Sequence, residues 1–141
     1  MQFERPLPVL PQIAPFSFGE DEVNFDDTVS VSCTITKGDL PVRIWWTLSD
    51  SFESQTEYNI STNDGVVILR SGNKISMLNI EAVKARHRGN YSCYASNKAG
   101  IAKQNAYLAI NGSKILFFYD LTPTLPTEFC NFRSNSRLYM I

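Results

Sequence analysis

Polar and apolar residues alternate along several short stretches of the chain, which predicts β-strands with one buried face. The clearest stretch runs from Thr28 to Thr36. Successive side chains of a strand point to opposite faces. The inward face would therefore carry Val29, Val31, Cys33 and Ile35. A second strand is expected from Val42 to Leu48, with Trp46 facing inward and Trp45 facing outward.

A hairpin is expected between two apolar runs at residues 66–70 and 74–80. The Gly72-Asn73 pair between them is typical of a tight turn and predicts that Ser71 pairs with Lys74. The register of a hairpin decides which side chains share a face. In this register the inward face carries Val67, Leu69 and Leu78. The outward face carries Ile68, Arg70, Ile75 and Met77.

Two more strands are expected at residues 91–96 and 104–110, with a short edge strand near Ile13. Short strands separated by turn residues at this spacing indicate an all-β sandwich of two antiparallel sheets. Prolines crowd the beginning of the chain, and the strand pattern ends near Asn111.

These patterns predict a linker, one domain and a tail. The linker is expected at residues 1–10, the domain at 11–111 and the tail at 112–141. The tail carries the third cysteine, Cys130, and has no strand partner left in a completed sandwich. It is expected to be disordered, or to be translated non-coding sequence beyond an exon boundary.

Cysteine, tryptophan and tyrosine fall at a recognisable spacing on the expected strands. Cys33 and Cys93 occupy inward positions, and Trp46 lies between them. Tyr91 precedes the second cysteine by two residues. Together they form the signature of an immunoglobulin-like sandwich, with an inter-sheet disulfide, a tryptophan packed against it and a tyrosine corner. Leu78 completes the expected core signature. A bridge closing a loop of about sixty residues contributes roughly 4 kcal/mol and implies an oxidising compartment.

The alternative is a reduced cytosolic immunoglobulin-like domain, in which both cysteines are small buried hydrophobes. Three Asn-x-Ser sequons, at Asn59, Asn90 and Asn111, favour a secreted surface instead. Asn59 is the best candidate for glycosylation, because its surroundings are predicted to be irregular and exposed. Asn90 is the least accessible of the three.

Composition and charge exclude several classes of function. The chain has 13 Lys and Arg against 14 Asp and Glu, for a net charge of −1, so binding to nucleic acid is not expected. No run of apolar residues is long enough to span a bilayer as a helix. The start of the chain has no basic lead-in, and prolines interrupt any apolar core, so no signal peptide is expected in it. An extracellular location would therefore come from a longer parent polypeptide.

Catalytic and metal-binding chemistry is not expected. The single histidine, His87, allows no multi-histidine zinc site and leaves no spare histidine for a Ser-His-acid arrangement. No glycine-rich phosphate loop is present. We expect no enzyme activity, no cofactor and no metal. A basic cluster could bind sulfated sugars, but a solvated turn is the favoured interpretation. It consists of Lys84, Arg86, His87 and Arg88.

Three stretches resemble an immunoglobulin domain of the Down syndrome cell adhesion molecule (Dscam) family, of the arthropod type and most closely the variable seventh domain. They are Phe16 to Glu20, Lys37 to Pro41 and Arg86 to Gly100. Most I-type domains carry Asp at the position of His87, and a histidine there is similar to the Dscam pattern. The resemblance covers Pro6 to Asn111. It implies an I-type domain of a cell-surface or shed receptor that binds identical copies in neurite self-avoidance, axon guidance and adhesion.

Outward apolar side chains give two candidate surfaces. The first is the homophilic face that the resemblance implies, formed by Ile68, Arg70, Ile75 and Met77. The second lies on the other sheet and consists of Trp45, Tyr94 and Tyr107. The second patch would serve a heterophilic immune-recognition module that binds other cell-surface or microbial ligands, or an inter-domain seam. The apolar residues of the first surface could also be scattered surface residues that need no partner, or be covered by a neighbouring domain. A purely structural spacer is the remaining alternative.

Overall fold

The computed structural model describes residues 6–50 and 56–111 of the chain. The predicted tail at 112–141, with Cys130, lies outside the described residues, as do the first five residues of the predicted linker. The chain divides into two units, Met1–Ala109 and Ile110–Ile141, and the strands described below belong to the first of them.

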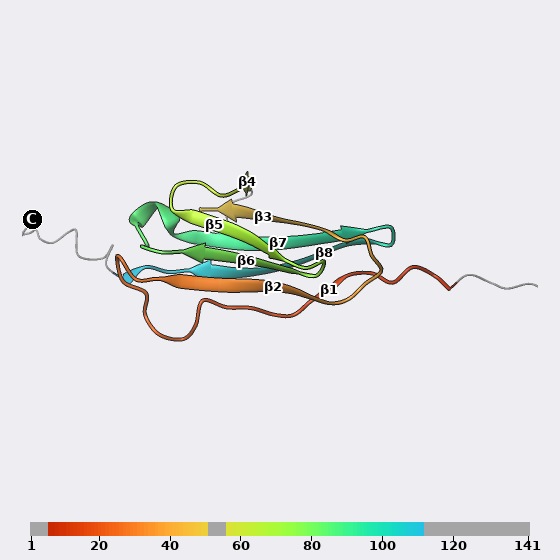
Figure 1. The fold of residues 1–141 in the computed structure, drawn as a ribbon. Coiled ribbons are helices and arrows are strands. Elements are labelled where there is room, and N and C mark those ends of the chain that lie inside the picture. The colour runs from red at the N-terminus through yellow and green to blue at the C-terminus, as the bar shows by residue number, and fades with distance from the viewer. Residues whose placement is uncertain (1–5, 51–55, 112–141) are drawn as a thin grey trace, which may run out of the picture. The chain divides into compact units, whose positions relative to one another are not determined.

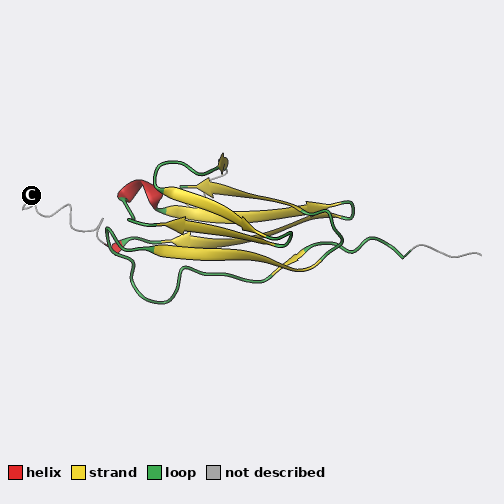
Figure 2. Cartoon of the chain, viewed as in Figure 1, coloured by secondary structure: helices red, strands yellow, loops and turns green. Residues whose placement is uncertain are grey.

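Two antiparallel sheets form the first unit, and helix is confined to short turns in its described part (Figures 1 and 2). The strands are β1 (Gln12–Ile13), β2 (Val29–Lys37), β3 (Arg43–Ser49), β4 (Tyr58–Ile60), β5 (Val66–Ser71), β6 (Ile75–Ile80), β7 (Gly89–Asn97) and β8 (Gly100–Leu108). A 3-10 turn, η1 (Ala85–His87), precedes β7. One sheet has the order β1-β2-β6-β5 and the other the order β4-β3-β7-β8. The predicted all-β sandwich is confirmed.

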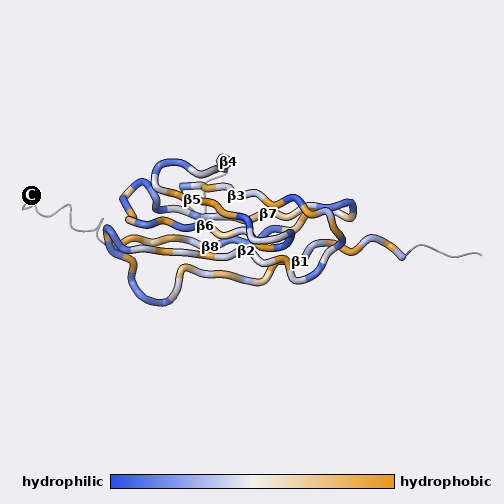
Figure 3. The backbone as a smooth tube through the Cα atoms, viewed as in Figure 1, coloured by the Kyte–Doolittle hydropathy of each residue, from blue (hydrophilic) through white to orange (hydrophobic). Residues whose placement is uncertain are grey.

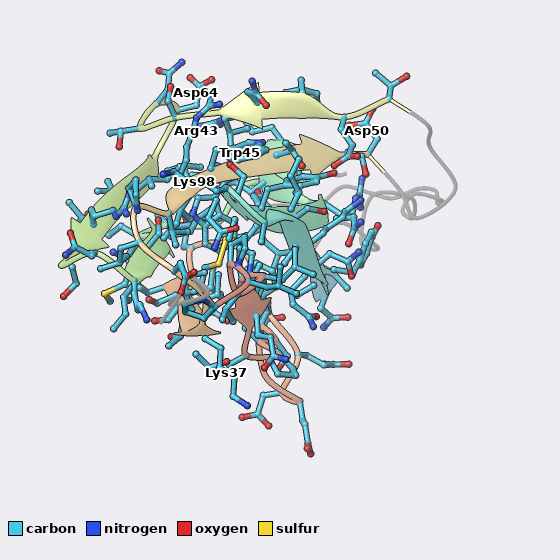
Figure 4. All side chains as sticks on the ribbon, turned by 90° about the vertical axis from the view of Figure 1, so that its right-hand side faces the viewer. Lys37, Arg43, Trp45, Asp50, Asp64 and Lys98 are labelled. Carbon is cyan, nitrogen blue, oxygen red and sulfur yellow. A yellow bond between two sulfur atoms is a disulfide. The ribbon has the colours of Figure 1, made fainter. Side chains whose placement is uncertain are left out.

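The disulfide lies between the two sheets (Figure 4), and the buried Trp46 lies beside it. Cys33 of β2 is bonded to Cys93 of β7, so the bridge joins the sheets across 60 residues of sequence. Trp46 of β3 pairs with Cys93 of β7 and is only 1% exposed. Its indole N–H donates a hydrogen bond of 3.0 Å to the buried Ser76 hydroxyl of the other sheet. Leu78 is fully buried in the same core.

A tyrosine corner fixes the turn before β7. The buried Tyr91 hydroxyl donates a 2.6 Å hydrogen bond to the carbonyl oxygen of His87, and burial raises the pKa of the phenol. His87 is itself buried. Its Nδ1 accepts from the backbone N–H of Lys84 at 2.9 Å, so Nε2–H donates to the carbonyl oxygen of Asp64 at 2.8 Å. The single histidine is thus a structural clamp between two turns.

The β5–β6 hairpin differs from its predicted register by one residue. Ser71 pairs with Ile75, not with Lys74, because the turn contains three residues rather than two. Gly72, the first of them, has a φ of +67°, a conformation that glycine adopts readily. A slip of one residue reverses the faces of a strand. The prediction for β5 was therefore wrong for every side chain of that strand.

The corrected register moves Ile68 and Arg70 away from the predicted homophilic face. Ile68 lies opposite the buried Leu78 and shares its inward face. The Arg70 guanidinium donates to the carbonyl oxygens of Val42 and Asn73, at 3.1 and 2.9 Å. Neither residue belongs to the outward face.

The end of the predicted linker is attached to the sandwich. Val9 N–H donates to the Asp39 carboxylate at 3.0 Å, and the Asn97 side-chain amide donates to the Val9 carbonyl oxygen at 2.7 Å. Gly38 lies close to the residues that follow Val9, because a Cβ built on Gly38 would be 2.8 Å from the Cα of Pro11. The chain is therefore held before β1 begins.

We predict that Ser76→Ala lowers the free energy of unfolding by about 1–3 kcal/mol, because it leaves the buried Trp46 indole N–H without its acceptor. Chemical denaturation measures this. Ser32→Ala, at an exposed position of β2, is the control and should change stability by less than about 0.5 kcal/mol. Equal effects of the two substitutions would contradict the prediction.

Candidate interaction surfaces

The outward face of the β5–β6 hairpin carries a strip of apolar side chains, which we call the β5–β6 strip. Leu69 lies directly opposite Met77. Val67 and Leu69 are 40% and 53% exposed, whereas Ile75 and Met77 are half-buried. The strip consists of Val67, Leu69, Ile75 and Met77. Hydrophobic positions along β5 are visible in Figure 3.

Short hydroxyl side chains border the strip on β2. Ser32 lies opposite Met77, and Thr34 lies opposite Ile75. Ser32 is exposed and Thr34 is half-buried. The two β2 positions beside the strip therefore carry hydroxyl groups rather than charges, and their small side chains allow a second surface to approach closely.

The residues just before β5 cover the first part of its free edge, at Val66 and Ile68. The Thr62 hydroxyl accepts from the backbone N–H of Ile68 at 2.9 Å and donates to its carbonyl oxygen at 3.4 Å. Val66 exchanges two backbone hydrogen bonds of 2.9 Å with Asn63. Backbone groups that are already paired cannot template another strand. This part of the edge is therefore closed to strand addition, which favours contact through the face of the sheet.

The other sheet carries an aromatic cluster on its outward face. The rings of Trp45 on β3 and Tyr94 on β7 are stacked, with centroids 5.3 Å apart and an angle of 5° between their planes. The Arg43 guanidinium lies over Trp45 at 4.9 Å, and the Lys103 ammonium lies over Tyr94 at 5.2 Å. Such cation–π contacts are worth about 0.5–1 kcal/mol each at exposed sites. Figure 4 shows Arg43 and Trp45 on β3.

Glu57 connects the aromatic cluster to the segment that leads into β4. Its carboxylate accepts from the Thr47 hydroxyl at 2.6 Å and from the Tyr94 hydroxyl at 2.9 Å. Lys103 lies 3.5 Å away. The hydrogen bond from Thr47, followed by those from Tyr94 and Lys103, lowers the pKa of the Glu57 carboxyl. Tyr94 and then Glu57 raise the pKa of Lys103. The cluster therefore keeps both side chains charged at neutral pH.

Tyr107 lies on the same sheet as the aromatic cluster but not within it. It pairs with Asn90, whereas Lys103 pairs with Tyr94. The Ser92–Asn105 pair separates the two positions. The predicted second patch thus divides into a Trp45–Tyr94 pair and a separate, half-buried tyrosine.

The three sequons differ in exposure. Asn59 is exposed on β4. Asn90 is 9% exposed on β7, which is paired on both sides, so this position does not fit a glycan in the folded domain. Asn111 is the last described residue, and its glycosylation stays a prediction.

The basic cluster is not a continuous binding corner. Lys84 forms an ion pair with Asp26 of the acidic segment, which fits the interpretation as a solvated turn. Arg86 donates to the carbonyl oxygen of Asp64 at 3.3 Å. His87 is buried. Within residues 6–50 and 56–111, no three His, Cys, Asp or Glu side chains are placed to hold a metal ion. No helix in the same ranges is long and apolar enough to cross a membrane.

Sequence reasoning missed several residues of both surfaces. Val67 and Leu69 were assigned to the core because the predicted β5–β6 turn was one residue too short. Arg43 and Lys103 carried a usable signal. Arg43 lies two residues before Trp45 on the outward face of β3, and Lys103 of β8 pairs with Tyr94. Glu57 carried none, because it lies in a segment without periodicity.

We predict that Glu57→Gln lowers the free energy of unfolding at pH 7 by less than about 1 kcal/mol, because the carboxylate is partly exposed. The pKa of the Glu57 carboxyl is lowered in the folded state, so the folded state binds a proton at Glu57 less readily than the unfolded state. The contribution of the Glu57 charge to stability is therefore present above the ordinary carboxyl pKa and is lost as the pH falls through the lowered pKa of the folded state.

Urea denaturation at a series of pH values tests this prediction. The difference between the parent chain and Glu57→Gln should vanish in acid, whereas Glu20→Gln, at an exposed position, should match the parent throughout. A difference that persists unchanged in acid would refute the role given to the Glu57 charge.

Comparison with known proteins places the fold in a family. The immunoglobulin domain family matches residues 11–97. The cell adhesion molecule Dscam1 of Drosophila melanogaster is 38% identical over 103 residues, which cover 73% of this chain and 5% of that protein. The human cell adhesion molecule DSCAML1 is 31% identical over 102 residues, which cover 72% of this chain and 4% of that protein. This chain thus spans a small part of these relatives.

Solved structures agree. The crystal structure of the Dscam1 Ig7 domain, isoform 5, is 42% identical, with a TM-score of 0.64, over 72% of this chain and 97% of that one. A titin I-band fragment, 21% identical over 72% of this chain and 32% of that one with a TM-score of 0.59, shares the fold alone. The expected resemblance is confirmed. The chain belongs to the immunoglobulin domain family, and among its members it is similar to domains of Dscam cell adhesion molecules.

Proposed function

We propose that this chain is a self-recognition module of an adhesion receptor and binds an identical copy on another cell through the β5–β6 strip. The receptor would be a longer protein on the extracellular side of the plasma membrane, or a secreted form of it. Neurite self-avoidance and axon guidance are the processes that such binding would serve. The exposed apolar strip, with Ser32 and Thr34 beside it on β2, carries this proposal.

Two observations support an extracellular adhesion role. The relatives are named cell adhesion molecules, and each is far longer than this chain. The Cys33–Cys93 bridge fits an oxidising compartment, because disulfides are rare in the cytosol. The same comparisons support a binding module rather than an enzyme.

The energetics of the strip suit a weak, register-sensitive contact. Fully burying an apolar side chain of this size is worth about 1.5–3 kcal/mol. In a two-fold contact both copies use the same surface, so each side chain of the strip contributes to the binding free energy twice, once from each copy. The uncharged border of Ser32 and Thr34 adds no like-charge repulsion when two copies face each other. The paired edge of β5 directs the contact to the face of the sheet.

The aromatic cluster supports a second candidate, a heterophilic contact with another cell-surface or microbial ligand. Trp, Tyr and Arg are the residues most enriched among binding hot spots. Two copies meeting through this face would, however, bring Arg43 and Lys103 of one copy toward those of the other. Charges of this kind favour a partner of different composition over a second copy.

We predict that Leu69→Glu or Met77→Glu weakens self-association by at least about tenfold. The loss of one buried apolar side chain is worth about 1.5–3 kcal/mol, and 1.4 kcal/mol corresponds to a factor of ten. Sedimentation and bead aggregation of the receptor ectodomain measure the effect. Leu40→Glu is the matched control, because Leu40 is 51% exposed, close to the 53% of Leu69, but lies outside the strip.

The same assay separates the two candidates. Trp45→Glu should leave self-association unchanged. Loss of self-association with Trp45→Glu, together with normal association of Met77→Glu, would transfer the contact to the aromatic cluster. Normal association of every variant in the strip would leave the module a heterophilic binder or a spacer.

A further inference from the structure

We propose that Asn59 carries an N-linked glycan and that this glycan covers the aromatic cluster, so that one sheet of the sandwich is closed to protein partners. The inference rests on the extracellular location in the proposed function, but not on self-binding. It begins with the sequon Asn59-Ile60-Ser61. The substrate of this modification is a lipid-linked oligosaccharide of the secretory pathway.

Asn59 is placed where a large substituent can be accommodated. Its strand, β4, is at the edge of its sheet and pairs with β3 alone. Asn59 and Ser61 are both exposed, and among the described residues the Asn59 side chain has no hydrogen-bonding partner. Asn90 shows the contrast within the same chain, since its side chain is buried on a strand with neighbours on both sides.

The strand register points the glycan toward the aromatic cluster. Asn59 lies directly opposite Thr47 on β3, and residues in this relation share a face of the sheet. That face is the outward one, because the Thr47 hydroxyl contacts Glu57 there while the next residue back, Trp46, is in the core. Trp45, two residues before Thr47, shares this face. Asn59 is therefore a diagonal neighbour of Trp45.

Glu57 demonstrates that side chains from this part of the chain extend across β3. It precedes Asn59 by two residues, and its carboxylate contacts Tyr94 on β7, the strand beyond β3, at 2.9 Å. A glycan is far larger than a glutamate side chain. An oligosaccharide that starts at Asn59 thus extends over Trp45 and Tyr94. The Arg43 and Lys103 side chains there have N–H donors that suit sugar hydroxyls.

Covering this face assigns different roles to the two sheets. The aromatic cluster contains the residue types of a binding hot spot, and an exposed surface of that kind invites non-specific partners. A glycan above it would exclude proteins from the β4-β3-β7-β8 sheet. The β5–β6 strip on the opposite sheet has no sequon on its strands and would remain accessible.

Occupancy is tested on the receptor ectodomain secreted from eukaryotic cells. Mass spectrometry of the peptide containing Asn59 should find a glycan that is absent from Asn59→Gln and from Ser61→Ala. The second variant keeps the asparagine and removes only the sequon, so it guards against a folding defect of the first. No glycan is expected on the Asn90 peptide. A secreted, folded ectodomain with Asn59 unmodified would overturn the proposal.

Coverage is tested by acrylamide quenching of tryptophan fluorescence in the ectodomain and in its Trp45→Phe variant, so that the difference between the two proteins reports Trp45. Within the module Trp46 is shielded at 1% exposure, so quenching reports Trp45. The glycosylated protein should be quenched less than Ser61→Ala. Enzymatic removal of the glycan should raise its quenching to the value of that variant.

The outcomes separate this inference from the proposed function. Equal quenching with and without the glycan would refute coverage, whatever the behaviour in self-association. Reduced quenching in a protein that does not self-associate would support coverage and count against the self-recognition proposal alone. Self-association lost specifically on deglycosylation would contradict both assignments, because it would place the contact at the glycan-bearing sheet.

Discussion

The Cys33–Cys93 bridge and the Trp46 side chain beside it fix the relation between the two sheets. The bridge joins β2 of one sheet to β7 of the other, and the indole N–H reaches from β3 to Ser76 of β6. Four strands are therefore tied together at one point of the core. Once this point is fixed, alternation along each strand determines which side chains face solvent. Both candidate surfaces are consequences of that constraint.

The two outward faces differ in chemistry, and the difference suggests different partners. The β5–β6 strip is apolar and bordered by hydroxyl groups, whereas the other face combines stacked aromatic rings with Arg43, Lys103 and Glu57. An apolar strip brings no like charges together when it meets its own copy, whereas charged surfaces favour a complementary partner. The partners at the free edge of β5 matter as well, because they occupy the backbone groups of Val66 and Ile68 and so hinder strand addition there.

The sequence predicted the fold, the disulfide and the burial of Trp46 correctly, because strand alternation is a local signal and the spacing of the two cysteines, the tryptophan and Tyr91 is characteristic of this sandwich. It failed at the β5–β6 hairpin, where a turn of three residues instead of two reversed the assignment of Val67 to Arg70. The role of Glu57 could not be predicted, because its contacts with Thr47 and Tyr94 arise only when β4 pairs with β3. The burial of Asn90 likewise depends on pairing with β3 and β8, which its sequon does not encode.

Methyl NMR of the module over a range of protein concentrations tests the central claim most directly, because it observes the contact without altering the protein. If two copies meet through the β5–β6 strip, the methyl signals of Leu69 and Met77 shift or broaden as concentration rises, while the methyl signals of Leu40 and the indole N–H signal of Trp45, recorded in a nitrogen-correlated spectrum of the same samples, stay constant. Concentration-dependent changes at Trp45 with constant Leu69 and Met77 signals would contradict the account.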